Sequence, residues 1–178
     1  MSGHNKWSKI RVKKGVEDAK KSKVFAMLSK KITVESKLAK GDKNSPSLRK
    51  AIEIARESNM PIDNIDKAVA KGAGAGADTL TEVTYEAYGP GGVALIIEGI
   101  TDNKNRTGPE IKHILSKYGA NLSPQGSVMW AFSKGEDGWT ANNPMDISEN
   151  DKKALLTLLE ALDDQEDVED IYTNAGNL

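Results

Sequence analysis

Residues 71–78 read Lys-Gly-Ala-Gly-Ala-Gly-Ala-Asp, and this run of small residues divides the chain into two parts. Glycine and alanine offer too little apolar surface to build a core, and repeated glycine favours a flexible connection. The spacing of apolar residues also changes here, from helical before the run to strand-like after it. The sequence therefore predicts a linker over residues 72–78, between a basic helical domain (1–71) and an acidic α+β domain (79–178).

Before the linker, apolar residues recur at the three- and four-residue spacing of amphipathic helices. Val24, Leu28 and Ile32 mark one side of the first helix. Pro46 opens a second helix and Pro61 a third, since proline is favoured in the first turn. Three such helices can cover each other's apolar sides, so we expect a three-helix bundle with lysine and arginine outside.

After the linker, four segments have the apolar pattern of strands: residues 83–87, 93–97, 128–132 and 168–172. Two helices lie between them. Thr107 with Glu110 predicts a capping box for the first helix, and Ser148 with Asp151 caps the second. We expect an α+β fold in which the bundle is followed by a two-layer α/β sandwich, with a four-stranded, mostly antiparallel sheet and both helices on one face.

The 178 residues carry a formal net charge of only −1, but the charge is unevenly placed. Residues 1–78 hold 18 basic and 9 acidic side chains, for a net +9, whereas residues 79–178 have a net −10. A basic domain of this kind is the electrostatic signature of a nucleic-acid binder. Lysine-rich helices that are merely well solvated are the alternative.

Few residues suited to catalysis or metal binding are present. The chain has two histidines and no cysteine, and it lacks the G-x-S-x-G, H-E-x-x-H and G-x-x-x-x-G-K-S/T motifs. We therefore expect no enzyme, no cofactor and no metal site. No apolar run is long enough to span a membrane, and the polar, basic start does not resemble a secretory signal. The expected location is the cytoplasm.

The N-terminal segment combines an aromatic residue with a run of cations. Trp7 lies among Lys6, Lys9, Arg11, Lys13 and Lys14, and the next helix adds Lys20, Lys21 and Lys23. The cations can contact phosphates, and an exposed indole can stack on an unpaired base. Alternatively, Trp7 is a hydrophobic anchor of the bundle.

A second polar cluster, Asn103, Lys104, Asn105 and Arg106, leads into a predicted helix N-terminus. The free N–H groups and dipole at such an end suit a phosphate oxygen, as do the two cations. The alternative is that Asp102 and the asparagines only hydrogen-bond the backbone of a tight loop.

Several ordered motifs resemble the YebC/PmpR family, which includes the mitochondrial translational activator of cytochrome c oxidase subunit one. They are Met1-Ser-Gly-His-Asn-Lys-Trp7, Leu48-Arg-Lys-Ala-Ile52, Asn59-Met-Pro-Ile-Asp-Asn-Ile65, Tyr85-Glu-Ala-Tyr-Gly-Pro-Gly-Gly92, Thr101-Asp-Asn-Lys-Asn-Arg-Thr107 and Gly126-Ser-Val128. Leu158 to Asn174 resembles the family's C-terminus. Members usually carry a third α/β domain before the last helix. Here residues 133–147 form only a short connection, so we expect that domain to be absent.

The resemblance implies a cytoplasmic regulator of gene expression. Members are described as transcriptional regulators that bind DNA, and others as ribosome-associated factors that relieve stalling at proline-rich stretches. By position, the implied nucleic-acid contacts are His4, Lys6, Trp7, Lys13, Lys14, Lys20, Lys23, Asn103, Asn105 and Arg106. The expected partner is DNA or ribosomal RNA or tRNA, with the ribosome as a further candidate and no membrane or small-molecule substrate. The alternative function is a protein-interaction adaptor that uses the acidic domain.

Overall fold

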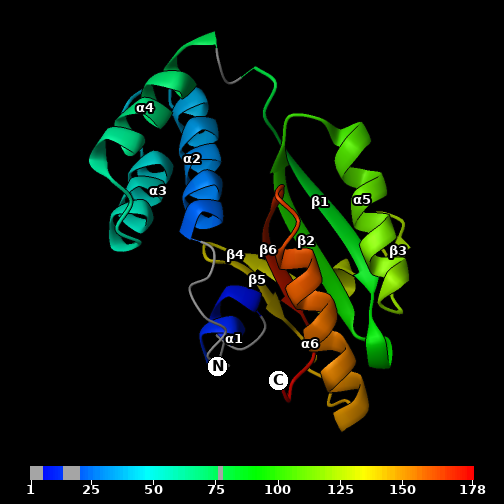
Figure 1. The fold of residues 1–178 in the computed structure, drawn as a ribbon. Coiled ribbons are helices and arrows are strands. Elements are labelled where there is room, and N and C mark those ends of the chain that lie inside the picture. The colour runs from blue at the N-terminus through cyan, green and yellow to red at the C-terminus, as the bar shows by residue number, and fades with distance from the viewer. Residues whose placement is uncertain (1–5, 14–20, 76–77) are drawn as a thin grey trace. The chain divides into compact units, whose positions relative to one another are not determined.

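The computed structural model describes residues 6–13, 21–75 and 78–178, which form two compact units (Figure 1). The helical unit contains residues Asp18–Glu82 with Ile100–Asn103. The α+β unit contains Met1–Glu17, Val83–Gly99 and Lys104–Leu178. Each unit has its own buried core, and the two are described separately below.

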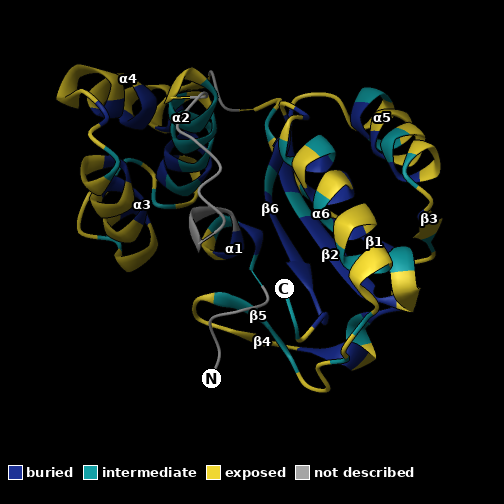
Figure 2. Ribbon diagram, turned by 60° about the horizontal axis from the view of Figure 1, so that its bottom comes forward, coloured by how far each residue is buried: buried dark blue, intermediate teal, exposed yellow. Residues whose placement is uncertain are grey.

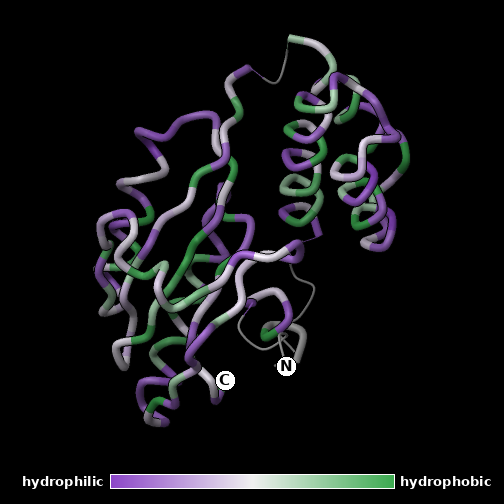
Figure 3. Tube along the Cα trace, turned by 180° about the vertical axis from the view of Figure 1, so that it is seen from behind, coloured by the Kyte–Doolittle hydropathy of each residue, from purple (hydrophilic) through white to green (hydrophobic). Residues whose placement is uncertain are grey.

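The helical unit is built from α2 (Lys21–Leu38), α3 (Pro46–Glu57) and α4 (Ile62–Ala73). Each helix turns one apolar side inward, and the inward residues form a single cluster that includes Ile32, Leu48, Ala55 and Ile65. The tube in Figure 3 shows the resulting alternation of hydrophobic and hydrophilic positions along these helices. The predicted three-helix bundle is confirmed, with the proline-led starts of α3 and α4 where the sequence placed them.

Gly72 belongs to this bundle and not to a linker. It is buried near the end of α4, and a Cβ there would overlap the backbone oxygen of Thr33 and approach the Ser36 Cβ to 2.5 Å. The close approach of α4 to α2 therefore needs a residue without a side chain. The predicted linker boundary at residue 72 is wrong for this reason, because α4 continues through Ala73 and Gly74 is its C-cap.

The α+β unit contains a four-stranded sheet in the order β3-β1-β2-β6. Its strands are β1 (Thr81–Tyr88), β2 (Ala94–Thr101), β3 (Asn121–Ser123) and β6 (Val168–Thr173). Both β1–β3 and β2–β6 are antiparallel pairs. Helices α5 (Lys104–Lys117) and α6 (Glu149–Asp163) pack their buried sides on one face, as Figure 2 shows. The predicted sandwich is confirmed, and so is the Ser148 cap, whose hydroxyl accepts from the Asp151 N–H.

The opposite face of the sheet is covered by residues whose secondary structure was predicted wrongly from the sequence pattern. The predicted strand over 128–132 is instead a short 3-10 helix, η3 (Met129–Ala131), and the fourth strand of the sheet is β3. The stretch expected to be a simple connection forms the hairpin of β4 (Phe132–Gly135) and β5 (Gly138–Ala141). An apolar run predicts burial but not backbone conformation, and here Val128, Ala131 and Phe132 are buried against Ile96 of the sheet.

The first helix, α1 (Trp7–Lys13), packs on β6 and therefore belongs to the α+β unit. Trp7 and Ile10 lie in the same core cluster as α5 and α6. Lys6 also forms an isolated antiparallel bridge with Tyr172 of β6. This differs from the expected helical domain over residues 1–71, because two apolar residues of the N-terminal segment are buried in the other unit.

Candidate nucleic-acid interface

The N-terminal segment is fixed to the last strand by both apolar and charged contacts. Trp7 is only 1% exposed, so its indole is not available to stack on a base. Trp7 is a hydrophobic anchor, but of the α+β unit and not of the helical bundle. The Lys6 Nζ lies 3.1 Å from Asp170 Oδ2 and 5.5 Å from the centre of the Tyr172 ring. Ser8 donates its backbone N–H and its hydroxyl to the same carboxylate, at 3.3 and 3.0 Å.

The other predicted contacts of this segment are divided between the two units. Lys9 is exposed on α1, whereas Lys21 and Lys23 begin α2 in the helical unit, Lys21 exposed and Lys23 partly buried. The side chains of Arg11 and Lys13 lie outside the described part of the structure, as do His4, Lys14 and Lys20 entirely. Among the described residues, the predicted contacts of this segment therefore lie on or beside α1 in one unit and on α2 in the other.

A second set of cations, which the sequence analysis missed, lines the outer sides of α3 and α4. These exposed residues are Arg49, Lys50, Arg56, Lys67 and Lys71, and the exposed Glu53, Glu57, Asp63 and Asp66 lie on the same two helices. Residues 21–75 hold 12 basic and 6 acidic side chains in all. Helical spacing could have found this set, because its members occupy the positions between the apolar residues of each helix. The exposed surface of the helical unit therefore carries a net positive charge.

The polar cluster at residues 103–106 is split by the start of α5. The helix begins at Lys104, and the Thr101 hydroxyl accepts from the Asn103 N–H at 2.9 Å. Asn103, Lys104 and Asn105 are exposed. The predicted capping box is wrong, since Thr107 lies inside the helix and its buried hydroxyl faces a carboxylate elsewhere in the unit.

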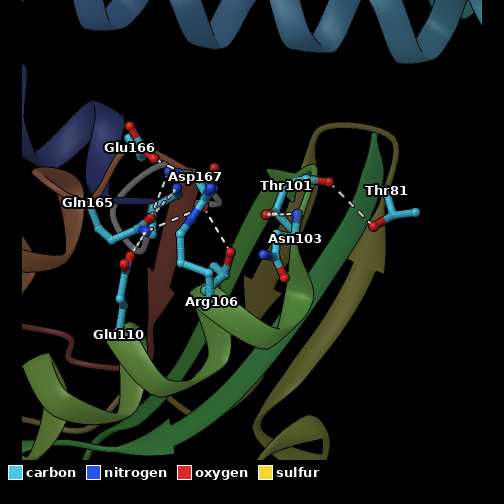
Figure 4. Close-up of polar contacts among 10 residues, drawn as sticks. Thr81, Thr101, Asn103, Arg106, Glu110, Gln165, Glu166 and Asp167 are labelled. Carbon is cyan, nitrogen blue, oxygen red and sulfur yellow. Dashed lines mark hydrogen bonds and ion pairs between the residues drawn. The ribbon is translucent and has the colours of Figure 1, made fainter. Parts of the chain in front are cut away.

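That carboxylate belongs to Asp167, which is fully buried and toward which the Arg106 side chain points (Figure 4). Arg106 Nη2 lies 2.9 Å from Asp167 Oδ2 and 3.5 Å from Glu166 Oε1. The Thr107 hydroxyl donates to the same Asp167 oxygen at 2.8 Å. A buried carboxylate needs such donors to offset its desolvation, so the main contacts of Arg106 stabilise the fold.

Gln165 extends the same network. Its side-chain oxygen accepts from the backbone N–H of Asp167 and Val168, and its Nε2 donates to Glu110 Oε2 at 2.8 Å. Burial, with the nearby Asp167 charge, raises the pKa of the Tyr85 phenol. The second predicted cluster therefore consists of a partly exposed arginine paired with a buried carboxylate, beside three exposed polar residues, of which Lys104 is the cation.

Within the described ranges, no three histidine, cysteine or carboxylate side chains gather where they could hold a metal ion. No described helix is both long and apolar enough to cross a membrane.

An open groove of about 390 Å³ beside α5 is lined by Pro109, Glu110, His113, Ile114 and Gln165. Since Glu110 and Gln165 bond to each other, this groove presents mainly apolar surface.

Two family models together match most of the chain. Residues 5–75 match the TACO1/YebC protein N-terminal domain. Residues 80–136 and 133–175 match, in two segments, the TACO1/YebC second and third domain.

Several relatives are named "Probable transcriptional regulatory protein". The one from Petrotoga mobilis is 44% identical over 183 residues, which span 100% of this chain and 72% of the relative. That from Syntrophus aciditrophicus is 53% identical over 75% of this chain and 55% of its own length. The relative from Kosmotoga olearia is 36% identical over 98% of this chain and 94% of its own length. The crystal structure of the conserved hypothetical protein Aq1575 from Aquifex aeolicus matches with a TM-score of 0.81 and 27% identity, over 89% of this chain and 91% of that one.

Proposed function

Because the chain belongs to the TACO1/YebC family, we propose that it is a nucleic-acid-binding regulator of gene expression. The observation that carries the proposal is the set of exposed cations on α3 and α4, in a unit whose described helical part has twice as many basic as acidic residues. The names of the relatives support a regulatory role.

The chemistry of this surface favours contact with phosphates over reading of base sequence. Lysine and arginine side chains that neutralise phosphates release condensed counterions, which gives affinity without sequence information. Lys104 and Asn105 of the α+β unit, with the exposed Asn103 that precedes them in the chain, are further candidate contacts. Non-enzymatic binding accounts for these residues, and no catalytic role is proposed for them.

Charge reversal on α3 tests the proposal. The variant Arg49→Glu/Lys50→Glu/Arg56→Glu should bind an RNA hairpin or a DNA duplex on the order of 100-fold more weakly than wild type in a gel-shift titration at fixed salt, because three phosphate contacts are lost. The matched control is Lys112→Glu/Lys117→Glu/Lys153→Glu, which makes the same charge change at exposed positions of α5 and α6. Equal losses in both variants would show that overall charge, and not the α3 surface, determines binding.

A ribosomal target and a DNA target give different results with the same proteins. If ribosomal RNA is bound, wild type and control should sediment with ribosomes while the α3 variant stays in the supernatant. If DNA regulation is the function, wild type should prefer particular duplex sequences over random ones at moderate salt. Absence of nucleic acid after crosslinking in cells would favour the protein-interaction adaptor instead.

A further inference from the structure

Trp130 is an exposed tryptophan that is nevertheless held in one position. It lies in η3, and its side chain is among the most exposed large apolar groups of the described residues, at 60%. The ring nitrogen donates to the Ser127 backbone oxygen at 3.0 Å and to the Tyr88 hydroxyl at 3.3 Å. The polar edge of the indole is thus engaged, and its exposed area lies on the rest of the ring.

The surroundings of Trp130 are also fixed by hydrogen bonds. The Tyr88 hydroxyl donates to the same Ser127 oxygen at 2.9 Å, so phenol and indole share one acceptor. The buried Glu86 carboxylate accepts from the backbone N–H of Gly126 and Val128, which closes the loop before η3. The Asn142 amide donates to the Trp130 backbone oxygen at 3.3 Å. A preorganised aromatic surface loses little conformational entropy when a ligand binds.

The chain around this aromatic surface is polar but uncharged. Residues 121–133 contain no lysine, arginine, aspartate or glutamate, in a protein that is 29% charged. Two amides lie near Trp130. Asn142 donates to the Trp130 backbone oxygen and accepts from the Ser133 hydroxyl, and Asn121 is paired with Tyr88 across the β1–β3 register. Paired residues of an antiparallel ladder project from the same face of the sheet, so Asn121 lies on the Tyr88 side.

We propose that Trp130 is a stacking site for an unpaired nucleobase, with amide side chains beside it that can hydrogen-bond the base edge. The inference rests on the proposed function. Every base has a π-face that stacks on an indole, and asparagine amides match the donor and acceptor groups of base edges. Because residues 121–133 carry no cation that could contact a phosphate, this site recognises bases, whereas the cations of the helical unit contact phosphates. A charged peptide is disfavoured because nothing at residues 121–133 would pair with its charges.

The site is tested with the full chain, an unstructured RNA oligonucleotide and the fully paired duplex of the same sequence. Fluorescence anisotropy should show that Trp130→Ala weakens binding of the single strand about tenfold and leaves the duplex within twofold, because paired bases are not free to stack. Trp130→Phe should recover most of the single-strand affinity. The control is Leu122→Ala, which truncates an exposed apolar side chain whose partner in the register is Ala87, on the opposite face of the sheet. Leu122→Ala should leave the affinities for the single strand and for the duplex unchanged.

Three outcomes would overturn the inference while leaving the proposed function intact. They are an unchanged single-strand affinity in Trp130→Ala, an equal loss for both nucleic acids, and a loss that Trp130→Phe does not relieve. Unchanged nucleic-acid binding together with loss of self-association in sedimentation velocity would assign Trp130 to a protein contact instead. If wild type binds neither nucleic acid, the proposed function itself fails, which separates the two results.

Discussion

At the scale of single residues, the three tryptophans show how environment decides what the same side chain can do. Trp7 of α1 is buried in the core of the α+β unit, Trp139 donates to Glu98 Oε1 at 2.8 Å, and Trp130 is largely exposed. Base stacking requires an exposed face, so it is open to Trp130 and closed to Trp7. The cations beside Trp7 in the sequence predict a ligand contact there. Burial, however, and not the neighbouring residues in the sequence, determines which indole can contact a ligand.

Tyr85 gives a pH-dependent prediction at this scale. Its pKa is raised above the ordinary 10.0 by burial first and by the Asp167 charge second, so the folded state holds the phenol proton more tightly than the unfolded state. Tyr85 therefore contributes stability that is fully present below pH 10 and is lost as pH rises through the folded pKa. Urea unfolding at pH 7 and near pH 10.5 should show a smaller loss of unfolding free energy in Tyr85→Phe than in wild type. Identical losses would contradict the prediction.

At the scale of elements, the contact between α2 and α4 depends on one glycine. In Gly72→Ala the new methyl group would overlap the Thr33 backbone oxygen, and backbone cannot move aside as a side-chain tip can. We expect a destabilisation of about 2–3 kcal/mol, typical of overpacking against a fixed neighbour, measured by urea denaturation. The matched control is Gly74→Ala, whose Cβ would have no contact closer than 3.6 Å and which should change stability by under about 1 kcal/mol. Similar effects of both substitutions would argue against the packing explanation.

Elements whose signals are local could be predicted from the sequence, and contacts between distant segments could not. The bundle helices and the Ser148 cap depend on residues within one or two turns, and these were predicted correctly. The Arg106 side chain points toward Asp167, which lies 61 residues later in the chain. Trp7 is buried because α1 packs on β6. Phosphate binding by Arg106 was inferred from its neighbours alone, whereas a buried carboxylate beyond those neighbours decides its main contacts.

At the scale of the whole molecule, a net charge of −1 conceals a sequence with +9 in residues 1–78 and −10 in residues 79–178. Binding through phosphates releases counterions, so it responds to salt in proportion to the number of contacts and not to the net charge of the chain. A nearly neutral protein can therefore still bind a polyanion strongly.

The salt dependence provides the corresponding prediction. For wild type, the logarithm of the binding constant should fall linearly with the logarithm of salt concentration. In the α3 triple variant, the slope for duplex DNA should be shallower by about 2–3, since about 0.9 is lost for each phosphate contact removed. The control variant on α5 and α6 should keep the wild-type slope. A slope that is unchanged in the α3 variant would mean that those cations do not touch phosphates.

The packing of α1 on β6 also sets an order of events during synthesis. The helix of residues 7–13 is synthesised before the strand that buries Trp7, residues 168–173. Contacts of such long sequence separation close late and slow the folding of the unit that contains them. A nascent chain therefore carries Trp7 and Ile10 without the strand that buries them until residues 168–173 have been translated. A chain truncated before β6 lacks that strand permanently. Exposure of Trp7 and Ile10 therefore distinguishes a chain without residues 168–173 from one that contains them.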